Sequence, residues 1–209
     1  MADTKQKLID GALTAIRTHG IAGTSARTIA AAAGVNQALV FYHFGSVDDL
    51  ITTACRVATE ERVASYRPRL AAVGSLRELL DLGRTLHVEE RAAGNVRVLA
   101  QTLAGAQMDE KLVEPTAAAL ALWTDEIETV LRRVLADSPL TELADPAGLA
   151  RAVSAAFVGL ELYDGVDPAG AESALDALEQ LSVLVEVVDS LGPIARRALR
   201  SRARKTARR

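Results

Sequence analysis

Hydrogen-bonding and aromatic side chains gather in one short stretch that carries no charge. Residues 28–47 contain no Asp, Glu, Lys or Arg. Gln37 has an amide that can pair with adenine through one donor and one acceptor, and Ala38 is small enough to approach a thymine methyl group. Tyr42 and His43 can donate hydrogen bonds to phosphate oxygens. Together these side chains are typical of a surface that reads DNA.

The preceding residues predict two helices that would help to position this stretch. Apolar residues recur at helical spacing over about residues 4–18, and Gly20 favours the end of that first helix. A second helix is expected over about residues 25–32. The side-chain oxygen of Thr24 or Ser25 can cap its first turn.

A third helix should carry the reading residues. Gly34 permits a sharp turn, Asn36 is the expected cap, and the helix should run through His43 and end at Gly45. Base edges in a major groove are read near the N-terminal end of such a helix, and Arg27 on the preceding helix could reach a phosphate or a guanine. An ordinary αα-corner with solvated polar residues explains the spacing equally well, so spacing alone leaves both interpretations open.

The remaining sequence predicts helices throughout. Hydrophobic residues make up 49% of the 209 residues and aromatic residues only 3%, and no segment alternates with the period of a strand. We expect a fourth helix from Val47 to about Tyr66 with Pro68 beyond its end, and a kink or a new helix start at Pro115. The expected fold class is all-α, with an N-terminal three-helix helix-turn-helix domain and a C-terminal helical bundle domain. The expected boundaries are 1–46 for the helix-turn-helix domain, 47–195 for the helical domain and 196–209 for a basic tail.

Of the last two expected helices, the one over about 146–163 has one apolar face, and the one over about 170–191 is apolar nearly all round. A helix of this kind is buried on more than one side, and a partner subunit is a natural second cover. We therefore expect a homodimer. The side chains expected at its interface are Val153, Phe157, Leu160, Leu178, Leu181 and Val185.

Charge is distributed unevenly along the chain. The net charge is −3, yet residues 196–209 hold eight basic residues and no acidic ones. This tail could contact DNA phosphates or simply keep the chain end soluble, and both interpretations stay open. The first residues lack the apolar stretch of a signal peptide, and polar residues and glycines interrupt residues 28–47. We expect a cytoplasmic protein without a membrane span.

Patterns that would indicate catalysis or metal binding are weak. His87, Glu89 and Glu90 could suggest a metal or acid–base site. Only His87 and Glu90 share one helical face and no clear third ligand accompanies them, so a solvated helix face is the preferred interpretation. There is no nucleophile motif, phosphate loop or zinc spacing. The single cysteine, Cys55, is expected to be a small buried hydrophobic residue. We expect no enzymatic activity, no metal and no cofactor.

Residues 27–50, RTIAAAAGVNQALVFYHFGSVDDL, resemble the DNA-binding domain of the TetR family of bacterial transcriptional repressors. The matching elements are the R-x-I-A run from Arg27, then Ala33-Gly34-Val35, the aromatic block 41–44 and Asp48-Asp49-Leu50. The resemblance covers about the first 55 residues. Ala38, Phe41 and Val47 depart from a frequent glycine, tyrosine and lysine of the family, and the last two departures remove expected phosphate contacts.

The resemblance implies a ligand-responsive repressor that binds a palindromic double-stranded DNA operator as a homodimer, with residues 35–44 as the recognition helix. The DNA contacts that it implies are Thr24, Ser25, Arg27, Asn36, Gln37, Ala38, Tyr42 and His43. It also implies an unknown small-molecule effector in the C-terminal domain without placing the pocket. Large or polar residues that interrupt the small apolar helices are candidate pocket residues, although core packing and plain surface explain them too: His87, Gln101, Gln107, Met108, Trp123 and Tyr163. The alternative function is a helical protein–protein interaction module without sequence-specific DNA binding.

Overall fold

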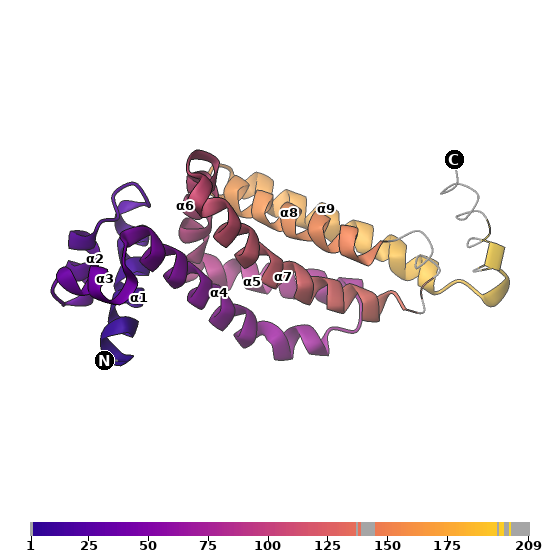
Figure 1. Cartoon of the computed structure of the whole chain (residues 1–209). Coiled ribbons are helices and arrows are strands. Elements are labelled where there is room, and N and C mark those ends of the chain that lie inside the picture. Colours follow the sequence, from indigo (N-terminus) through magenta and orange to yellow (C-terminus); the bar gives the residue numbers. More distant parts are fainter. Residues whose placement is uncertain (1, 137, 139–144, 196, 199–200, 202–209) are drawn as a thin grey trace. The chain divides into compact units, whose positions relative to one another are not determined.

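The computed structural model describes residues 2–136, 138, 145–195, 197–198 and 201, and every element within these ranges is helical (Figure 1). The predicted all-α class is therefore confirmed. The chain forms two compact units, of which unit 1 comprises residues 1–65 and 89–122, and unit 2 comprises residues 66–88 and 123–209. The expected domain boundaries at residues 46 and 195 differ from the limits of these two units, and the expected division stays a prediction. Most of the basic tail lies outside the described residues.

Unit 1 contains the helices that the first 50 residues predict. These are α1 (Ala2–His19), α2 (Ala26–Ala33), α3 (Ala38–Phe44) and the beginning of α4 (Val47–Ala72). The unit also takes in α6 (Asn95–Met108), the 3-10 turn η1 (Glu110–Leu112) and the beginning of α7 (Val113–Val134). Gly20 and Gly45, both at positive φ, follow the ends of α1 and α3 as expected.

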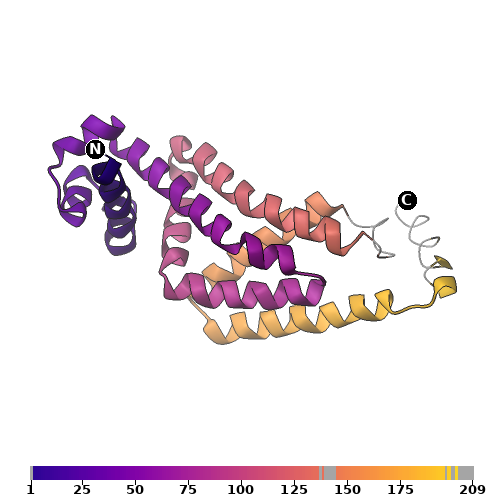
Figure 2. The same cartoon turned by 90° about the horizontal axis from the view of Figure 1, so that it is seen from below.

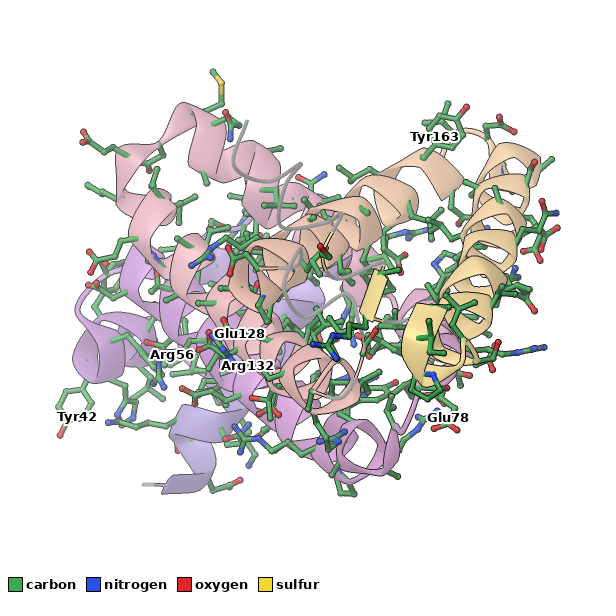
Figure 3. All side chains as sticks on the ribbon, turned by 90° about the vertical axis from the view of Figure 1, so that its right-hand side faces the viewer. Tyr42, Arg56, Glu78, Glu128, Arg132 and Tyr163 are labelled. Atoms are coloured by element: carbon green, nitrogen blue, oxygen red, sulfur yellow. The ribbon has the colours of Figure 1, made fainter. Side chains whose placement is uncertain are left out.

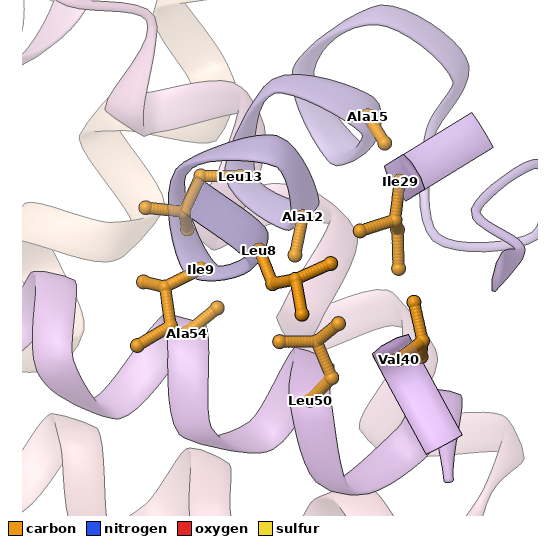
Figure 4. Packing of buried hydrophobic residues seen from close by; sticks show 9 residues of the cluster. All are labelled: Leu8, Ile9, Ala12, Leu13, Ala15, Ile29, Val40, Leu50 and Ala54. Atoms are coloured by element: carbon orange, nitrogen blue, oxygen red, sulfur yellow. The ribbon is translucent and has the colours of Figure 1, made fainter. Parts of the chain in front are cut away.

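The core of unit 1 is apolar and closed to solvent. Leu8 and Ala12 of α1, Ile29 of α2, Val40 of α3 and Leu50 of α4 are each 0% exposed, and their side chains converge in Figure 4. Each of the four helices therefore contributes at least one fully buried side chain. Burying apolar side chains supplies the main driving force for this packing.

A glycine sets the closest approach between α1 and α2. A Cβ atom at Gly11 would lie 2.8 Å from the Ile29 carbonyl oxygen and 2.9 Å from the Ala33 Cβ atom. Only a residue without a side chain fits this crossing. Gly11 thus fixes how near α2 can come to the helix that supports it.

Unit 2 consists of the end of α4, most of α5 (Leu76–Ala92), the remainder of α7, α8 (Pro146–Asp164) and α9 (Pro168–Asp189). Tyr66 and Leu70 of α4 and Val73, which follows it, pack with Val130 of α7 in one buried cluster. Asp145 caps α8 by accepting hydrogen bonds from the next turn. Helices α8 and α9 contact each other next to the short turn that joins them, and Figure 2 shows them diverging from it.

The predicted end of α4 at Tyr66 is wrong, because the helix continues to Ala72 with Pro68 inside it. Proline removes one helical hydrogen bond. Pro68 is exposed, so water can satisfy the carbonyl that loses its partner. The Arg133 Nη2 atom donates to the carbonyls of Leu70 and Val73 at 2.8 and 2.9 Å, which holds the last turn in place. Near Pro115 the chain behaves as expected, since α7 starts anew at Val113.

Candidate nucleic-acid interface

A reciprocal pair of hydroxyl groups begins α2. The Thr28 N–H donates to Ser25 Oγ at 3.2 Å, and the Ser25 N–H donates to Thr28 Oγ1 at 2.8 Å. This is a capping box in which a threonine replaces the more frequent Glu or Gln. Thr24 instead donates its hydroxyl to the Gly20 carbonyl at 2.7 Å. Of the two expected caps, Ser25 is the one that the structure uses.

The turn between α2 and α3 depends on the backbone of Gly34, whose φ is 65°. The Gly34 N–H donates to the Ala31 carbonyl at 3.3 Å and the Val35 N–H donates to the Ala30 carbonyl at 3.0 Å. A Cβ atom at Gly34 would meet nothing within 4 Å. The left-handed conformation, rather than crowding, therefore requires glycine here.

Packing orients α3 so that one side faces outward. Val40 is 0% exposed, and Leu39 and Phe44 pack against the same core. At the start of the helix, Asn36 Oδ1 accepts the Ala38 N–H at 2.8 Å, so the expected capping role of Asn36 is confirmed. Gln37 occupies the formal N-cap position, and its side chain makes no capping hydrogen bond.

The outward side of α3 presents the side chains that can touch a groove. Gln37 and Ala38 are exposed, Phe41 is 52% exposed and Tyr42 is 74% exposed. Tyr42 points away from its helix in Figure 3. The centroids of the Tyr42 and His43 rings lie 4.9 Å apart, in an edge-on arrangement. Phe41 was not among the expected DNA contacts. Its position four residues after Gln37 was the signal that it shares the same face.

This surface has little positive charge. Arg27, exposed on α2, is the only Lys or Arg between residues 18 and 55. The first turn of α2 has no acidic residue, whereas α4 begins with Asp48 and Asp49. Asp49 is held by Ser46, whose hydroxyl donates to its carboxylate at 2.6 Å. A phosphate backbone at this surface would meet mainly neutral donors and helix N-termini.

The family model described as bacterial regulatory proteins, tetR family, matches residues 8–54, which run from α1 into α4. The chain belongs to the TetR family. The resemblance drawn from residues 27–50 is thereby confirmed, and the protein is a transcriptional regulator with a DNA-binding helix-turn-helix region. TetR regulators are not enzymes, in agreement with the expectation for this chain.

Relatives of this TetR-family chain extend the match beyond the helix-turn-helix region. An uncharacterised HTH-type transcriptional regulator of Mycobacterium tuberculosis is 24% identical over 166 residues, which are 79% of this chain and 85% of the relative. A crystal structure of a TetR-family regulator from Rhodococcus sp. is 26% identical, with a TM-score of 0.72, covering 90% of this chain and 99% of that one. The multidrug binding protein EbrR, solved with proflavin, is 28% identical, with a TM-score of 0.60, covering 85% and 99%.

The pocket candidate His87 is buried in unit 2 between two carboxylates. Its Nδ1 atom lies 2.8 Å from Glu161 Oε1 and its Nε2 atom 3.9 Å from Asp164 Oδ1, both on α8. Glu161 and Asp164 are only 2% and 7% exposed. His87 and Glu90 are both buried, so the expectation that they line a solvated helix face is wrong. Contacts with helices distant in the sequence explain that burial.

The other pocket candidates lie in different surroundings. Trp123 is half-buried in unit 2, with its ring centre 5.8 Å from that of Tyr66. Tyr163, also in unit 2, is 53% exposed and extends from the end of α8 in Figure 3. Gln101, Gln107 and Met108 are exposed on α6, in unit 1, and Met108 is 89% exposed. The six candidates are therefore divided between the two units.

The expected interface helices carry exposed apolar side chains. Val153 is 36% and Leu178 is 39% exposed, while Phe157 and Leu160 are half-buried. The side chains of Leu181 and Val185 lie outside the described residues. Large exposed hydrophobic residues along α8 and α9 are Leu149, Val153, Leu162, Tyr163, Leu178, Val183 and Val187.

Two findings on the described residues bear on other functions. No three His, Cys, Asp or Glu residues among them are grouped so that they could hold a metal ion. None of the helices in the described ranges is long and apolar enough to cross a membrane. Cys55 is partly buried with its Sγ atom 3.9 Å from Thr102 Oγ1, and burial raises the pKa of its thiol.

Proposed function

We propose that this TetR-family regulator represses transcription by binding a pseudo-palindromic operator as a homodimer, and that a small molecule releases it. The observation that carries the proposal is the exposed side of α3. Gln37, Ala38, Phe41 and Tyr42 project from a helix whose other side is anchored in a closed core. A rigid helix with polar and aromatic groups at its N-terminal half is suited to a major groove.

Within this proposal, Gln37 reads a base and the surrounding groups hold the phosphates. The Gln37 side chain is exposed and makes no capping bond, so its amide is available to an adenine edge. Arg27, Tyr42, His43 and the capped start of α2 at Ser25 supply phosphate contacts. With a single arginine among them, one subunit would bind weakly. Two subunits on one operator provide the missing affinity through a higher effective concentration.

The exposed apolar side chains of α8 and α9 support the homodimer. Val153 and Leu178 represent a set that a single chain leaves in water. Large exposed apolar patches mark interaction sites. A pseudo-palindromic operator offers the two copies of α3 in a dimer successive major grooves, about 34–36 Å apart.

A flat, positively charged small molecule is the effector class that we propose for unit 2. The half-buried ring of Trp123 in this unit can contact a flat cation. EbrR, which is similar along most of the chain, was solved with proflavin, an aromatic dye.

The base-reading role is tested by selecting duplexes from random DNA with the full chain and repeating the selection with Gln37→Ala. We expect wild-type protein to enrich a pseudo-palindrome, and Gln37→Ala to lose preference at one base pair of each half-site, with a cost of about 1–3 kcal/mol. Gln107→Ala, at another exposed glutamine of unit 1, is the matched control and should keep the full preference. Equal weakening on every sequence would show that Gln37 is not a base reader. Selection of no sequence at all would favour a protein-interaction module instead.

The homodimer is tested by placing carboxylates on α8 and α9. Val153→Glu combined with Leu178→Glu should halve the mass measured by light scattering and weaken binding to the selected duplex by about 100-fold. Val88→Glu makes the same change at a 65% exposed residue of unit 2 outside both helices, and should leave the dimer intact. A doubly substituted protein that remains dimeric would rule out this interface.

The effector class is tested by titrating proflavin into the complex of the protein with the selected duplex. Proflavin should release the DNA, and fluorescein, an anionic dye of similar size, should not. Release by fluorescein alone would contradict a cationic effector.

A further inference from the structure

Four polar side chains in unit 1 connect four helices through charge-assisted hydrogen bonds. Arg17 Nη2 of α1 donates to Asn95 Oδ1 of α6 at 2.9 Å. Asn95 Nδ2 donates to Glu90 Oε2 on the last turns of α5 at 2.7 Å. Arg62 Nε of α4 donates to Glu90 Oε1 at 2.8 Å. We call Arg17, Arg62, Glu90 and Asn95 the α1–α6 junction.

Burial makes this junction sensitive to small displacements. Glu90 is only 7% exposed, and both of its carboxylate oxygens accept hydrogen bonds. A buried carboxylate that loses a donor is strongly destabilised, because water cannot take the place of that donor. Asn95 uses its oxygen toward Arg17 and its nitrogen toward Glu90, so its amide can satisfy both neighbours in only one orientation.

The junction lies at the first turn of α6, and the same helix contacts the DNA-binding helices further along. Val98 packs against the unit 1 core. Gln101 Oε1 would lie 3.0 Å from a Cβ atom at Gly20, which follows α1. Gly105 lies near Ile21, with 3.4 Å between a Cβ atom built at Gly105 and Ile21 Cδ1. A movement of α6 would therefore be transmitted to α1 and to the loop before α2.

The four residues belong to no predicted DNA contact, and none of them is on α2 or α3. Arg17 and Asn95 nevertheless link α6 to α1, and α1 supports α2 through the close crossing at Gly11. The junction thus fixes the position of the helices that carry the reading residues. Any change at α6 that breaks the Asn95 hydrogen bonds would leave Glu90 and Arg17 without these partners.

We propose that the α1–α6 junction is a positioning device that sets DNA affinity without touching DNA. While its hydrogen bonds are intact, α1, α2 and α3 are held in the arrangement that binds DNA. This inference rests on the proposed DNA surface of α3. Its residues are positioning residues, because they act on DNA only through α1 and α6.

The test exchanges the acid and the amide within the junction. Asn95→Asp replaces the donor facing Glu90 with a second carboxylate, and Glu90→Gln removes the charge that Arg62 requires. Each single substitution should weaken binding to the selected duplex about tenfold. In the double variant the carboxylate at position 95 accepts from Arg17, and the amide at position 90 accepts from Arg62. The double variant should bind the duplex within about threefold of wild type.

Controls separate a positioning role from a merely structural one. Thermal unfolding is measured for every variant, and Glu60→Gln, in an exposed ion pair with Arg56 on the same α4, should change DNA affinity less than about twofold. If the single variants lower the melting temperature but bind the duplex like wild type, the junction is only structural and the proposal is wrong. A double variant that binds no better than the worse single variant would contradict it equally.

Should Asn95→Asp fail to fold, Arg17→Met keeps the alkyl packing and removes the bond to Asn95; DNA affinity equal to wild type in that variant overturns the proposal. If wild-type protein selects no duplex, the proposed function has failed instead. Unchanged melting temperatures of the Arg17→Met and Glu60→Gln proteins show that both are folded. A difference in DNA binding between these proteins and wild type then concerns the junction, whereas loss of DNA binding in all of them, wild type included, concerns the proposed function.

Discussion

Units 1 and 2 differ in how completely they bury their apolar side chains. In unit 1, Leu8, Ile29, Val40 and Leu50 are fully buried in an apolar core, and the buried Glu90 lies apart from them in the α1–α6 junction. In unit 2, charged groups around His87 are buried, while apolar side chains along α8 and α9 remain exposed. Unit 1 therefore closes its own core. The helices α8 and α9 leave apolar surface for something else to cover.

This difference agrees with the division of labour that we propose. A module that reads DNA needs side chains held in fixed positions, and a closed core provides them. A module that responds to a ligand and pairs with a second chain needs surface and buried polar groups that another molecule can complete.

The largest effect is expected from truncation in the closed core. Leu50→Ala should lower the free energy of unfolding by about 2–5 kcal/mol, because the methyl groups lost from a fully buried site leave a cavity. Leu178→Ala, the same substitution at a 39% exposed residue of α9, should cost less than about 1 kcal/mol in dilute monomer. Urea denaturation at low protein concentration measures both changes in the free energy of unfolding. Equal costs would mean that the two units do not differ in this way.

An intermediate effect is expected at the crossing of α1 and α2. Gly11→Ala should destabilise unit 1 by about 1–3 kcal/mol, since its Cβ atom would meet the Ile29 carbonyl oxygen at 2.8 Å. Gly83→Ala is the matched change inside α5, where a Cβ atom would meet nothing within 4 Å. That variant should gain about 0.5–1 kcal/mol from the better helix propensity of alanine. Thermal melts that shift in the same direction would contradict the tight crossing.

The smallest effect concerns Cys55 as a reporter of unit 1. Burial raises the pKa of its thiol, so less thiolate is present at pH 8 than in an exposed cysteine. Iodoacetamide should therefore alkylate Cys55 on the order of tenfold more slowly than a cysteine peptide. Because folding favours the protonated thiol, its contribution to stability is present at neutral pH and is lost as pH rises through the raised pKa. Alkylation at the rate of the peptide would show that unit 1 opens readily around this residue.

The sequence predicted most of unit 1, because local chemistry determines it. Glycines at positions 20, 34 and 45 and the hydroxyl cap at Ser25 mark the helix boundaries, and the apolar spacing of α1 identified the buried side chains Leu8, Ala12 and Ile16. The full set of candidate DNA contacts was implied by the family resemblance, and the roles of these residues stay predictions. Of the two expected caps of α2, Thr24 and Ser25, Ser25 is the one found in the structure.

Contacts between distant segments could not be predicted in this way. The burial of His87 depends on Glu161 and Asp164, which a helix far along the chain supplies. Pro68 is tolerated inside α4 because Arg133 of α7 bonds to the carbonyls that follow it. Within α1 alone, Gly11 is only a weak helix former. Its role becomes evident once α2 is packed against it. No pattern within one helix contains this information.

The threonine of the capping box at the start of α2 implies a compromise between folding and DNA binding. Thr28→Glu would supply the carboxylate that capping boxes usually have, and an acid in the first turn of a helix stabilises it by about 0.3–1 kcal/mol. The same carboxylate would stand next to Ser25, where a phosphate is expected to approach the helix N-terminus. A protein that melts higher and binds DNA less well would result. The native threonine leaves that end of α2 open to an anion from outside the chain.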